Sequence, residues 1–255
     1  MAVVLAGSFT YANELGRNLL TPGSLLLGAA EGCFTCGHEH GEGDRCLAFY
    51  FDPSLFEELA SEAGARRALF ARNSLPSLRS LAPLVARATV AAQAQGNEPK
   101  PSIGGTRTTP LEELALDLAA AALAESSAGR HRPAPASTKR DERRIAAVAH
   151  FMEDRFAEPC TLNDLARLAG LSPFHFLRVF RATTGLTPHQ HLLRTRLRAA
   201  AISLARTEAP VTDVALATGF EDLSNFTRTF RAEYRLSPLQ YRARFHGPPR
   251  RQSAP

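Results

Sequence analysis

Two stretches of the 255-residue chain decide its fold: LARLAGLSPFHFLRVFRATTGLTP at residues 165–188 and GFEDLSNFTRTFRAEYRLSPLQYR at residues 219–242. The second stretch repeats the first. The residue pairs that match at a separation of 50 positions include Arg178 and Arg228, Phe180 and Phe230, Arg181 and Arg231, Ala182 and Ala232, and Pro188 and Pro238. Each stretch has a short helical pattern, a glycine and a second helical pattern, which is typical of a helix-turn-helix. The sequence therefore predicts two such units in tandem.

Local signals place the ends of the predicted helices. Thr161 is suited to be an N-cap, with Asp164 three positions later as in a capping box. Gly170 ends that helix, and Ser172 followed by a proline begins the next one. The segment 188–206 predicts one long helix between the units. Two units on such a spacer would reach successive major-groove faces, about 34 Å apart.

Residues 143–245 resemble the AraC/XylS class of transcription regulators, because both units and their spacing agree. The resemblance implies a tandem helix-turn-helix DNA-binding domain that usually activates promoters, works with RNA polymerase and is fused to a regulatory domain. The chain departs from the family at Arg235, where glycine is common before the second Ser-Pro, whereas Gly185 keeps that role in the first unit. A non-glycine residue there needs the left-handed conformation, at a cost of about 1 kcal/mol.

The charge of the chain is divided unevenly. Residues 139–255 carry 19 Lys and Arg against 11 Asp and Glu, a net charge of +8, and residues 1–138 carry a net charge of −3. All but one of those 19 basic residues are arginine, the side chain suited to phosphates and guanine edges. We expect a salt-sensitive affinity for double-stranded DNA. The alternative from charge alone is a solvated, arginine-rich surface.

The predicted DNA contacts lie on the second helix of each unit, on the face opposite its apolar residues. They are His175, Arg178, Arg181, Ser224, Asn225, Arg228 and Arg231. Arg178 is the leading base reader, because a guanidinium can bind both acceptors of guanine, and Asn225 and Arg228 are the readers of the second unit. Arg181 and Arg231 are expected to bind phosphates, which positions the protein without specifying sequence.

Two further residues of the first recognition helix have open alternatives. His175 could contact a base or a phosphate, or be a solvated histidine. Leu177 lies where some family members have a polar base reader, and here it could make only apolar contact, such as with a thymine methyl group.

The fold class is mainly α. We expect a regulatory domain at 1–126, a linker at 127–140, a DNA-binding domain of about seven helices at 141–246 and a disordered tail at 247–255. The regulatory domain reads as a small β unit followed by about three helices. Its expected strands are Ala2–Leu5, Leu25–Leu27 and Leu47–Phe51, and its expected helical faces are centred on Leu59, Leu81 and Leu114.

A cluster of potential metal ligands lies in the string GCFTCGHEHGEGDRC at residues 32–46. Its members are Cys33, Cys36, His38, His40 and Cys46. The Cys-x-x-Cys spacing lets two thiolates bind one zinc or other transition-metal ion. The string also resembles the first metal motif of cupins, with Asp44 in place of the usual glutamate, which implies a cupin-like barrel. Metal binding, a thiol-based sensor and a polar loop remain open alternatives.

The β unit is short for such a barrel, because only about 20 residues precede the strand at Leu25. It is reduced, or a partner chain completes it, or the true start lies upstream. A helical face at 111–118 could pair with a second copy as a homodimer or pack on its own β unit.

No uncharged apolar run reaches the roughly 20 residues of a membrane helix, and four cysteines do not form a disulfide scaffold. We therefore expect a cytoplasmic protein with no membrane contact. The function expected is a DNA-binding regulator, not an enzyme, that responds to a small-molecule, metal or thiol signal. The alternative is a cupin-type metal enzyme or a cysteine methyl-acceptor fused to a DNA-binding module.

Overall fold

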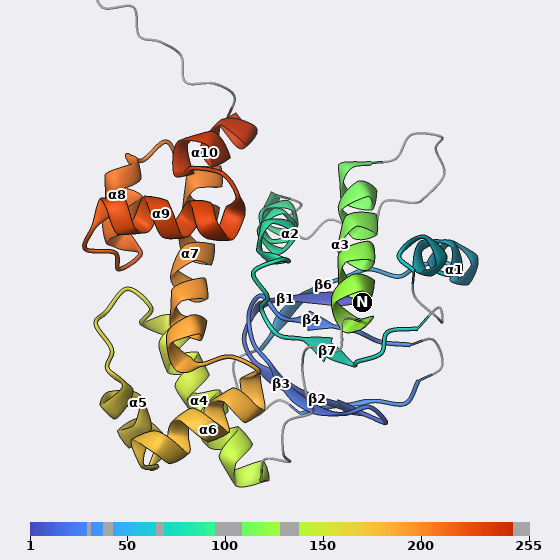
Figure 1. Cartoon of the computed structure of the whole chain (residues 1–255), viewed down its shortest axis with the longest axis horizontal. Coiled ribbons are helices and arrows are strands. Elements are labelled where there is room, and N and C mark those ends of the chain that lie inside the picture. Colours follow the sequence, from blue (N-terminus) through green and yellow to red (C-terminus); the bar gives the residue numbers. More distant parts are fainter. Residues whose placement is uncertain (30–31, 38–42, 65–68, 95–108, 128–137, 247–255) are drawn as a thin grey trace, which may run out of the picture.

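The computed structural model describes the chain in six segments: residues 1–29, 32–37, 43–64, 69–94, 109–127 and 138–246. An N-terminal part (residues 1–127) lies beside a helical module (residues 138–246), as Figure 1 shows. The predicted tail at 247–255 and most of the predicted linker lie outside the described residues.

In the described residues of the N-terminal part, short strands form two antiparallel sheets, in the orders β6-β1-β4-β7 and β3-β2-β5. The strands are β1 (Ala2–Ala6), β2 (Phe9–Asn13), β3 (Gly16–Leu20), β4 (Leu25–Leu26), β5 (Thr35–Gly37), β6 (Arg45–Ala48) and β7 (Ser74–Leu75). The strands expected near residues 2 and 25 are confirmed, and the third lies slightly earlier than expected. The β2–β3 hairpin was not predicted, because its sequence FTYANELGRNLL has few apolar residues at alternating positions. A cupin-like barrel stays a prediction.

In the described segments of this part, the three predicted helices are present: α1 (Pro53–Glu62), α2 (Ala82–Ala94) and α3 (Pro110–Ser127). α1 begins after Asp52, whose carboxylate accepts a hydrogen bond from the Ser54 amide at 2.9 Å. Leu114 and Leu118 of α3 are buried in one cluster with Val3 and Leu25 of the sheet. The face suggested for a second copy is therefore occupied by the chain's own core.

Between residues 138 and 246 the chain forms seven helices, the number expected. They are α4 (Lys139–Asp154), α5 (Leu162–Ala169), α6 (Pro173–Thr184), α7 (Pro188–Arg206), α8 (Val211–Ala217), α9 (Leu223–Tyr234) and α10 (Pro238–His246). α7 is a spine between a first unit (α4 to α6) and a second unit (α8 to α10), as Figure 1 shows. The capping box of Thr161 and Asp164 is present, and Ser172 caps α6. Arg235 is left-handed, with φ of 61°.

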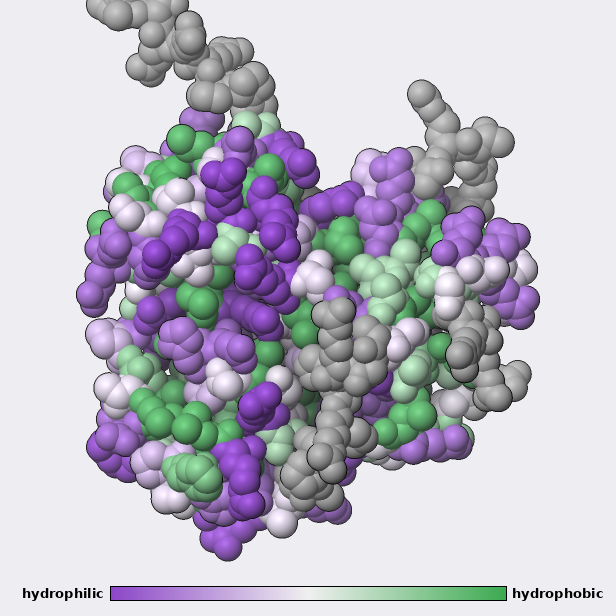
Figure 2. Space-filling model, viewed as in Figure 1, coloured by the Kyte–Doolittle hydropathy of each residue, from purple (hydrophilic) through white to green (hydrophobic). Residues whose placement is uncertain are grey.

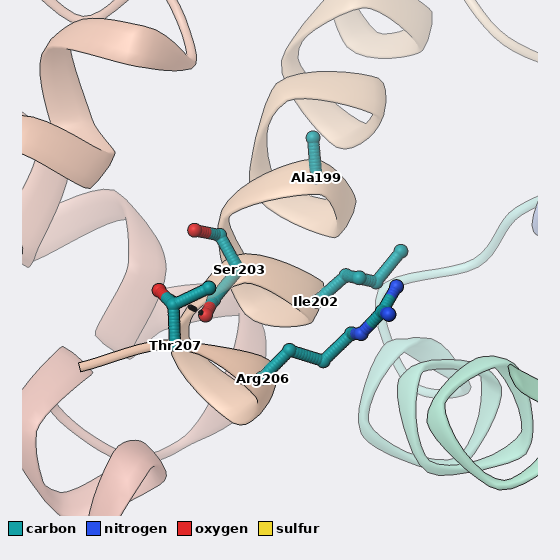
Figure 3. A pocket seen from close by; sticks show the side chains of 5 residues that line it. All are labelled: Ala199, Ile202, Ser203, Arg206 and Thr207. Atoms are coloured by element: carbon teal, nitrogen blue, oxygen red, sulfur yellow. Dashed lines mark hydrogen bonds between the residues drawn. The ribbon is translucent and has the colours of Figure 1, made fainter. Parts of the chain in front are cut away.

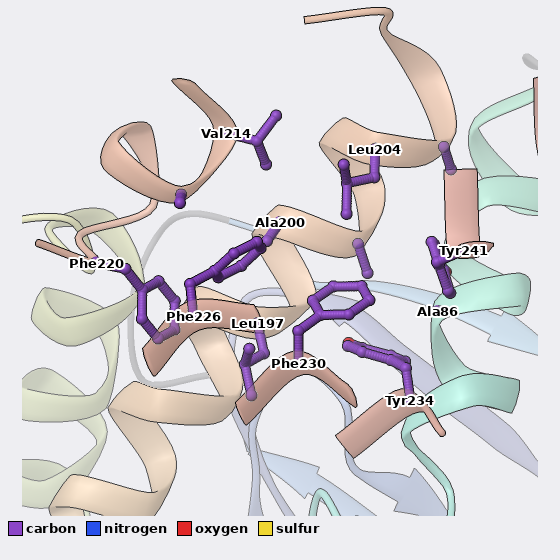
Figure 4. Close-up of a cluster of buried hydrophobic side chains, with 13 residues drawn as sticks. Ala86, Leu197, Ala200, Leu204, Val214, Phe220, Phe226, Phe230, Tyr234 and Tyr241 are labelled. Atoms are coloured by element: carbon purple, nitrogen blue, oxygen red, sulfur yellow. The ribbon is translucent and has the colours of Figure 1, made fainter. Parts of the chain in front are cut away.

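Each unit of the module has its own hydrophobic core. In the first unit, Phe176 and Phe180 of α6 pack with α4 and α5, and the cluster includes Leu19 of β3. In the second unit, Phe226 and Phe230 pack with the spine, and the cluster includes Ala86 of α2 (Figure 4). The N-terminal part thus contributes a buried side chain to the core of both units.

Candidate nucleic-acid interface

Helix α6 has one buried and one exposed face. Phe176 and Phe180 have no exposed surface, whereas Arg178 and Arg181 are exposed and His175 is half-buried. Ser172 at the N-cap and the left-handed Gly185 at the other end set the limits of the helix. The predicted division into core face and outward face is confirmed, and the role of the outward residues in binding stays a prediction.

Helix α9 repeats this arrangement. Its exposed outward residues are Leu223, Ser224, Asn225, Arg228 and Arg231, and Phe226 and Phe230 are fully buried. A guanidinium nitrogen of Arg228 donates to the amide oxygen of Asn225 at 3.2 Å. The two side chains therefore lie next to each other at the surface, as two neighbouring base readers in a major groove would. Thr229, which precedes the buried Phe230, is half-buried, and its hydroxyl donates to the Asn225 carbonyl at 2.7 Å.

The surface around the two helices differs in character. Figure 2 shows hydrophilic residues gathered over α9 and hydrophobic patches over α5 and α6. The exposed apolar residues of α5 and α6 are Leu162, Leu168, Phe174 and Leu177. Phe174 exposes 81% of its surface, so the first recognition helix presents an aromatic ring beside its arginines. Such a ring can contact a thymine methyl group, as proposed for Leu177.

Several arginines of the module form hydrogen bonds within the protein, which the count of charged residues did not reveal. Arg196 of α7 donates to the carbonyl oxygens of Phe156 at 2.7 Å, Gly219 at 2.8 Å and Glu158 at 3.0 Å. It thereby ties the segment that follows α4 to the turn between α8 and α9. The net charge of +8 overstates the basic surface that is free to meet DNA. A weak signal for this internal role is present in the sequence, because Arg196 directly precedes Leu197, a buried residue of the spine.

A buried carboxylate of the first unit is bound on several sides. Glu153 of α4 accepts hydrogen bonds from Arg198 at 2.6 Å and from the Thr195 hydroxyl at 2.7 Å, and His191 lies at 3.4 Å. Burial alone would raise the pKa of Glu153, but Arg198, His191 and Thr195 together lower it to about 2. Arg198 also donates to the Pro22 carbonyl at 2.9 Å, so the network reaches the N-terminal part.

A second buried carboxylate, Glu233, lies at the C-terminal end of α9. Arg194 of the spine lies 3.6 Å from one of its oxygens, and Arg79 of the N-terminal part lies 4.0 Å from the other. Burial raises the pKa of Glu233, and the two arginines only partly offset this effect. One carboxylate oxygen is buried without a hydrogen bond.

A cavity of about 390 Å³ lies between the N-terminal part and the module. Leu5 and Pro22 line it from the β unit, Phe156 from the end of α4, and Arg198 and Ile202 from the spine. Its volume is within the range of small-molecule sites. A neighbouring hollow of about 400 Å³ on α7 is lined by Ala199, Ile202, Ser203, Arg206 and Thr207 (Figure 3).

The predicted metal cluster is only partly described. His38 and His40 lie outside the described residues. Among the residues that are described, no three Cys, His, Asp or Glu side chains are arranged to hold a metal ion. Cys33 and Cys36 are exposed and Cys46 is half-buried. The described residues do not by themselves form a zinc site, and metal binding stays a prediction.

The environment of two thiols bears on the sensor alternative. Burial and the neighbouring Asp44 carboxylate, 3.8 Å away, raise the pKa of Cys46 to about 12. Burial and Asp44 also raise the pKa of Cys36. Both thiols are therefore protonated at neutral pH, whereas a reactive sensor needs the thiolate.

None of the described helices is long and apolar enough to cross a membrane.

Comparisons with known proteins match the helical module. A family model described as a helix-turn-helix domain matches residues 165–244. Regulatory protein SoxS from Salmonella typhimurium is 30% identical over 100 residues, which are 39% of this chain and 94% of SoxS. The transcriptional activator RhaS from Escherichia coli is 36% identical over 99 residues, which are 39% of this chain and 36% of RhaS. The chain thus spans almost all of SoxS but only about a third of RhaS.

Among solved structures, the chain is similar to a transcriptional regulator with an AraC-type DNA-binding domain from Chromobacterium violaceum. The sequence identity is 27%, the match covers 44% of this chain and 95% of that one, and the TM-score is 0.38.

Proposed function

Because the chain belongs to the AraC family of DNA-binding transcription regulators, we propose that it activates transcription by placing α6 and α9 in successive major grooves of promoter DNA. RhaS is an activator by its name, and this supports activation over repression as the proposed effect of this chain. The relatives named above are regulators, and this favours regulation over the alternatives of a metal enzyme or a cysteine methyl-acceptor. We expect RNA polymerase to be the partner of the activator.

One observation carries this proposal. The exposed pair Arg178 and Arg181 on α6 recurs as Arg228 and Arg231 on α9, each pair opposite fully buried phenylalanines. The two helices lie on either side of the spine α7, so both faces belong to the same module. A repeated basic face on two recognition helices is the arrangement that reads two successive groove segments.

The base readers can be tested by substitution. Arg178→Ala and Arg228→Ala should each weaken binding by about 1–3 kcal/mol and relax the base preference at one position. The probe is a DNA duplex that the full chain selects from a random-sequence pool, measured by gel-shift titration. Arg155→Ala is the matched control, because Arg155 is exposed in the same module and pairs with Glu158 at 3.4 Å. Unchanged affinity in both test variants would remove these arginines as readers.

The proposed regulation acts through the N-terminal part. The cavity between the two parts touches the spine and the β unit together, so a small molecule bound there would contact both. The cysteine and histidine cluster is the second candidate for the signal, with zinc as the metal. Metal analysis of the purified chain, with and without Cys33→Ser and Cys36→Ser, distinguishes the two. Metal retained by the parent chain and lost in the variants would support the cluster, and no metal in either would leave it a loop.

A further inference from the structure

A short segment of the N-terminal part, Pro76–Arg79, lies against the C-terminal ends of both recognition helices. The Pro76 ring packs beside Gly185, the residue that ends α6. Three positions later, Arg79 donates to the carbonyl of Ala232 near the end of α9 at 2.7 Å. Since the outward faces of both helices are exposed, this segment holds the helices by their ends and leaves their basic faces open.

The contact with α9 is anchored by charge. Arg79 lies 4.0 Å from the Glu233 carboxylate, and the spine residue Arg194 lies 3.6 Å from the other oxygen of the same group. Arg194 also donates to the carbonyl of Ser77 in the segment itself. The segment, the spine and the recognition helix therefore share one network, and loss of Arg79 leaves the buried Glu233 with a single cationic partner.

Buried apolar contacts support the same arrangement. Leu19 of β3 belongs to the core of the first unit, and Ala86 of α2 belongs to the core of the second (Figure 4). On the polar side, Arg17 of β3 binds Glu142 of α4 at 2.6 Å. The N-terminal part is thus attached to each unit separately, by at least one apolar and one charged contact.

Within the module, the two units are linked in sequence by the single helix α7. That helix, together with the hydrogen bonds of Arg196 to both units, leaves some bending and twisting of the units relative to each other, whereas attachment of both units to a third body restrains them further. DNA requires such a restraint, because the base pairs between two contacted segments set both their distance and their rotation. We propose that the segment Pro76–Arg79, with Arg79 as its main positioning residue, sets the angle between α6 and α9 and so selects the spacing of the two DNA subsites.

The inference rests on the proposed function, and a spacing series tests it separately. The full chain first selects a duplex from a random-sequence pool, and that duplex is then altered by inserting one or two base pairs between the two subsites. The wild type should lose roughly ten-fold or more in affinity on insertion. Arg79→Ala should lose only about two- to three-fold, with its affinity for a duplex that carries one subsite unchanged.

Arg45→Ala is the matched control, because Arg45 is an exposed arginine of β6 in the same N-terminal part. It should keep the wild-type spacing penalty. Pro76→Ala is the second test variant, because it removes the contact with the end of α6 and keeps the contact of Arg79 with α9. It should also reduce the penalty, and it keeps the inference testable if Arg79→Ala fails to fold. A merely structural role would lower affinity for all spacings alike.

Two outcomes would overturn the inference while leaving the proposed function intact. One is a wild type that selects a sequence but binds all spacings equally, and the other is an unchanged spacing penalty in folded Arg79→Ala and Pro76→Ala. If the wild type selects no sequence at all, the proposed function itself fails.

Discussion

The two helix-turn-helix units share a sequence pattern but differ at the end of the recognition helix. Both helices end in a left-handed residue, Gly185 with φ of 75° and Arg235 with φ of 61°. A Cβ added at Gly185 would lie 3.1 Å from the Pro76 ring, whereas Arg235 is exposed to solvent. The repeat therefore preserves the backbone conformation, and the surroundings decide whether a side chain is tolerated there.

The units also differ in their buried carboxylates. Glu153 of the first unit has three polar partners, and its pKa is lowered to about 2. Glu233 of the second unit has one oxygen without a hydrogen bond, and burial raises its pKa. The surroundings of the first carboxylate favour its charged form, whereas burial of the second disfavours its charged form and two arginines only partly offset this. Two units with the same helix-turn-helix pattern thus contain carboxylates in unlike electrostatic surroundings.

The largest expected effect distinguishes the two carboxylates. Glu153→Gln should lower the free energy of unfolding by about 3 kcal/mol at neutral pH, because it leaves Arg198 buried without an anion. Glu233→Gln should cost less, since burial already disfavours the charged form of Glu233 and one of its oxygens has no hydrogen bond to lose. Denaturant titrations of both variants, beside the wild type, measure the difference. Equal losses would contradict the contrast between the two sites.

The two carboxylates, Glu153 and Glu233, also predict how the stability of the protein depends on pH. The folded pKa of Glu153 is below its ordinary value of 4.5, so its stabilising effect is present above pH 4.5 and is lost as the pH falls towards 2. The wild type should lose stability in this interval more steeply than Glu153→Gln. Protonation of Glu233 acts in the opposite sense, so Glu233→Gln should steepen the acid loss.

The next effect concerns the ends of the recognition helices. Gly185→Ala should destabilise the protein by about 2 kcal/mol, because alanine is strained at a positive φ and its Cβ meets Pro76. Arg235→Ala, at the equivalent position, should change stability by no more than about 0.5 kcal/mol. Thermal unfolding followed by circular dichroism compares the two. A similar shift of the melting temperature in both variants would mean that the Pro76 ring moves away from the added methyl group without loss of stability.

The smallest expected effect is a gain. Arg235→Gly should stabilise the protein by about 1 kcal/mol, because glycine adopts a left-handed conformation without strain. The melting temperature should rise, and the affinity for the selected duplex should stay constant, since Arg235 is not among the predicted DNA contacts. A fall in melting temperature would show that the Arg235 side chain makes a stabilising contact.

How far the sequence predicted the structure differs between the two parts. In the module, the N-cap at Thr161, the left-handed Arg235 and the spine at 188–206 were all predictable, because capping residues and apolar spacing act within a few positions. In the N-terminal part, the β2–β3 hairpin was missed, since its strands are stabilised by pairing with neighbours and not by an alternating pattern.

The sequence by itself therefore determined the two recognition helices, their outward arginines and their separation along α7. Only the tertiary structure decided which arginines are internal and that Pro76–Arg79 reaches both helix ends. Arg198 and Pro22 are 176 positions apart, and Arg79 and Ala232 are 153 apart. Local propensities act over about one helical turn, so contacts between such distant residues depend on how the whole chain packs.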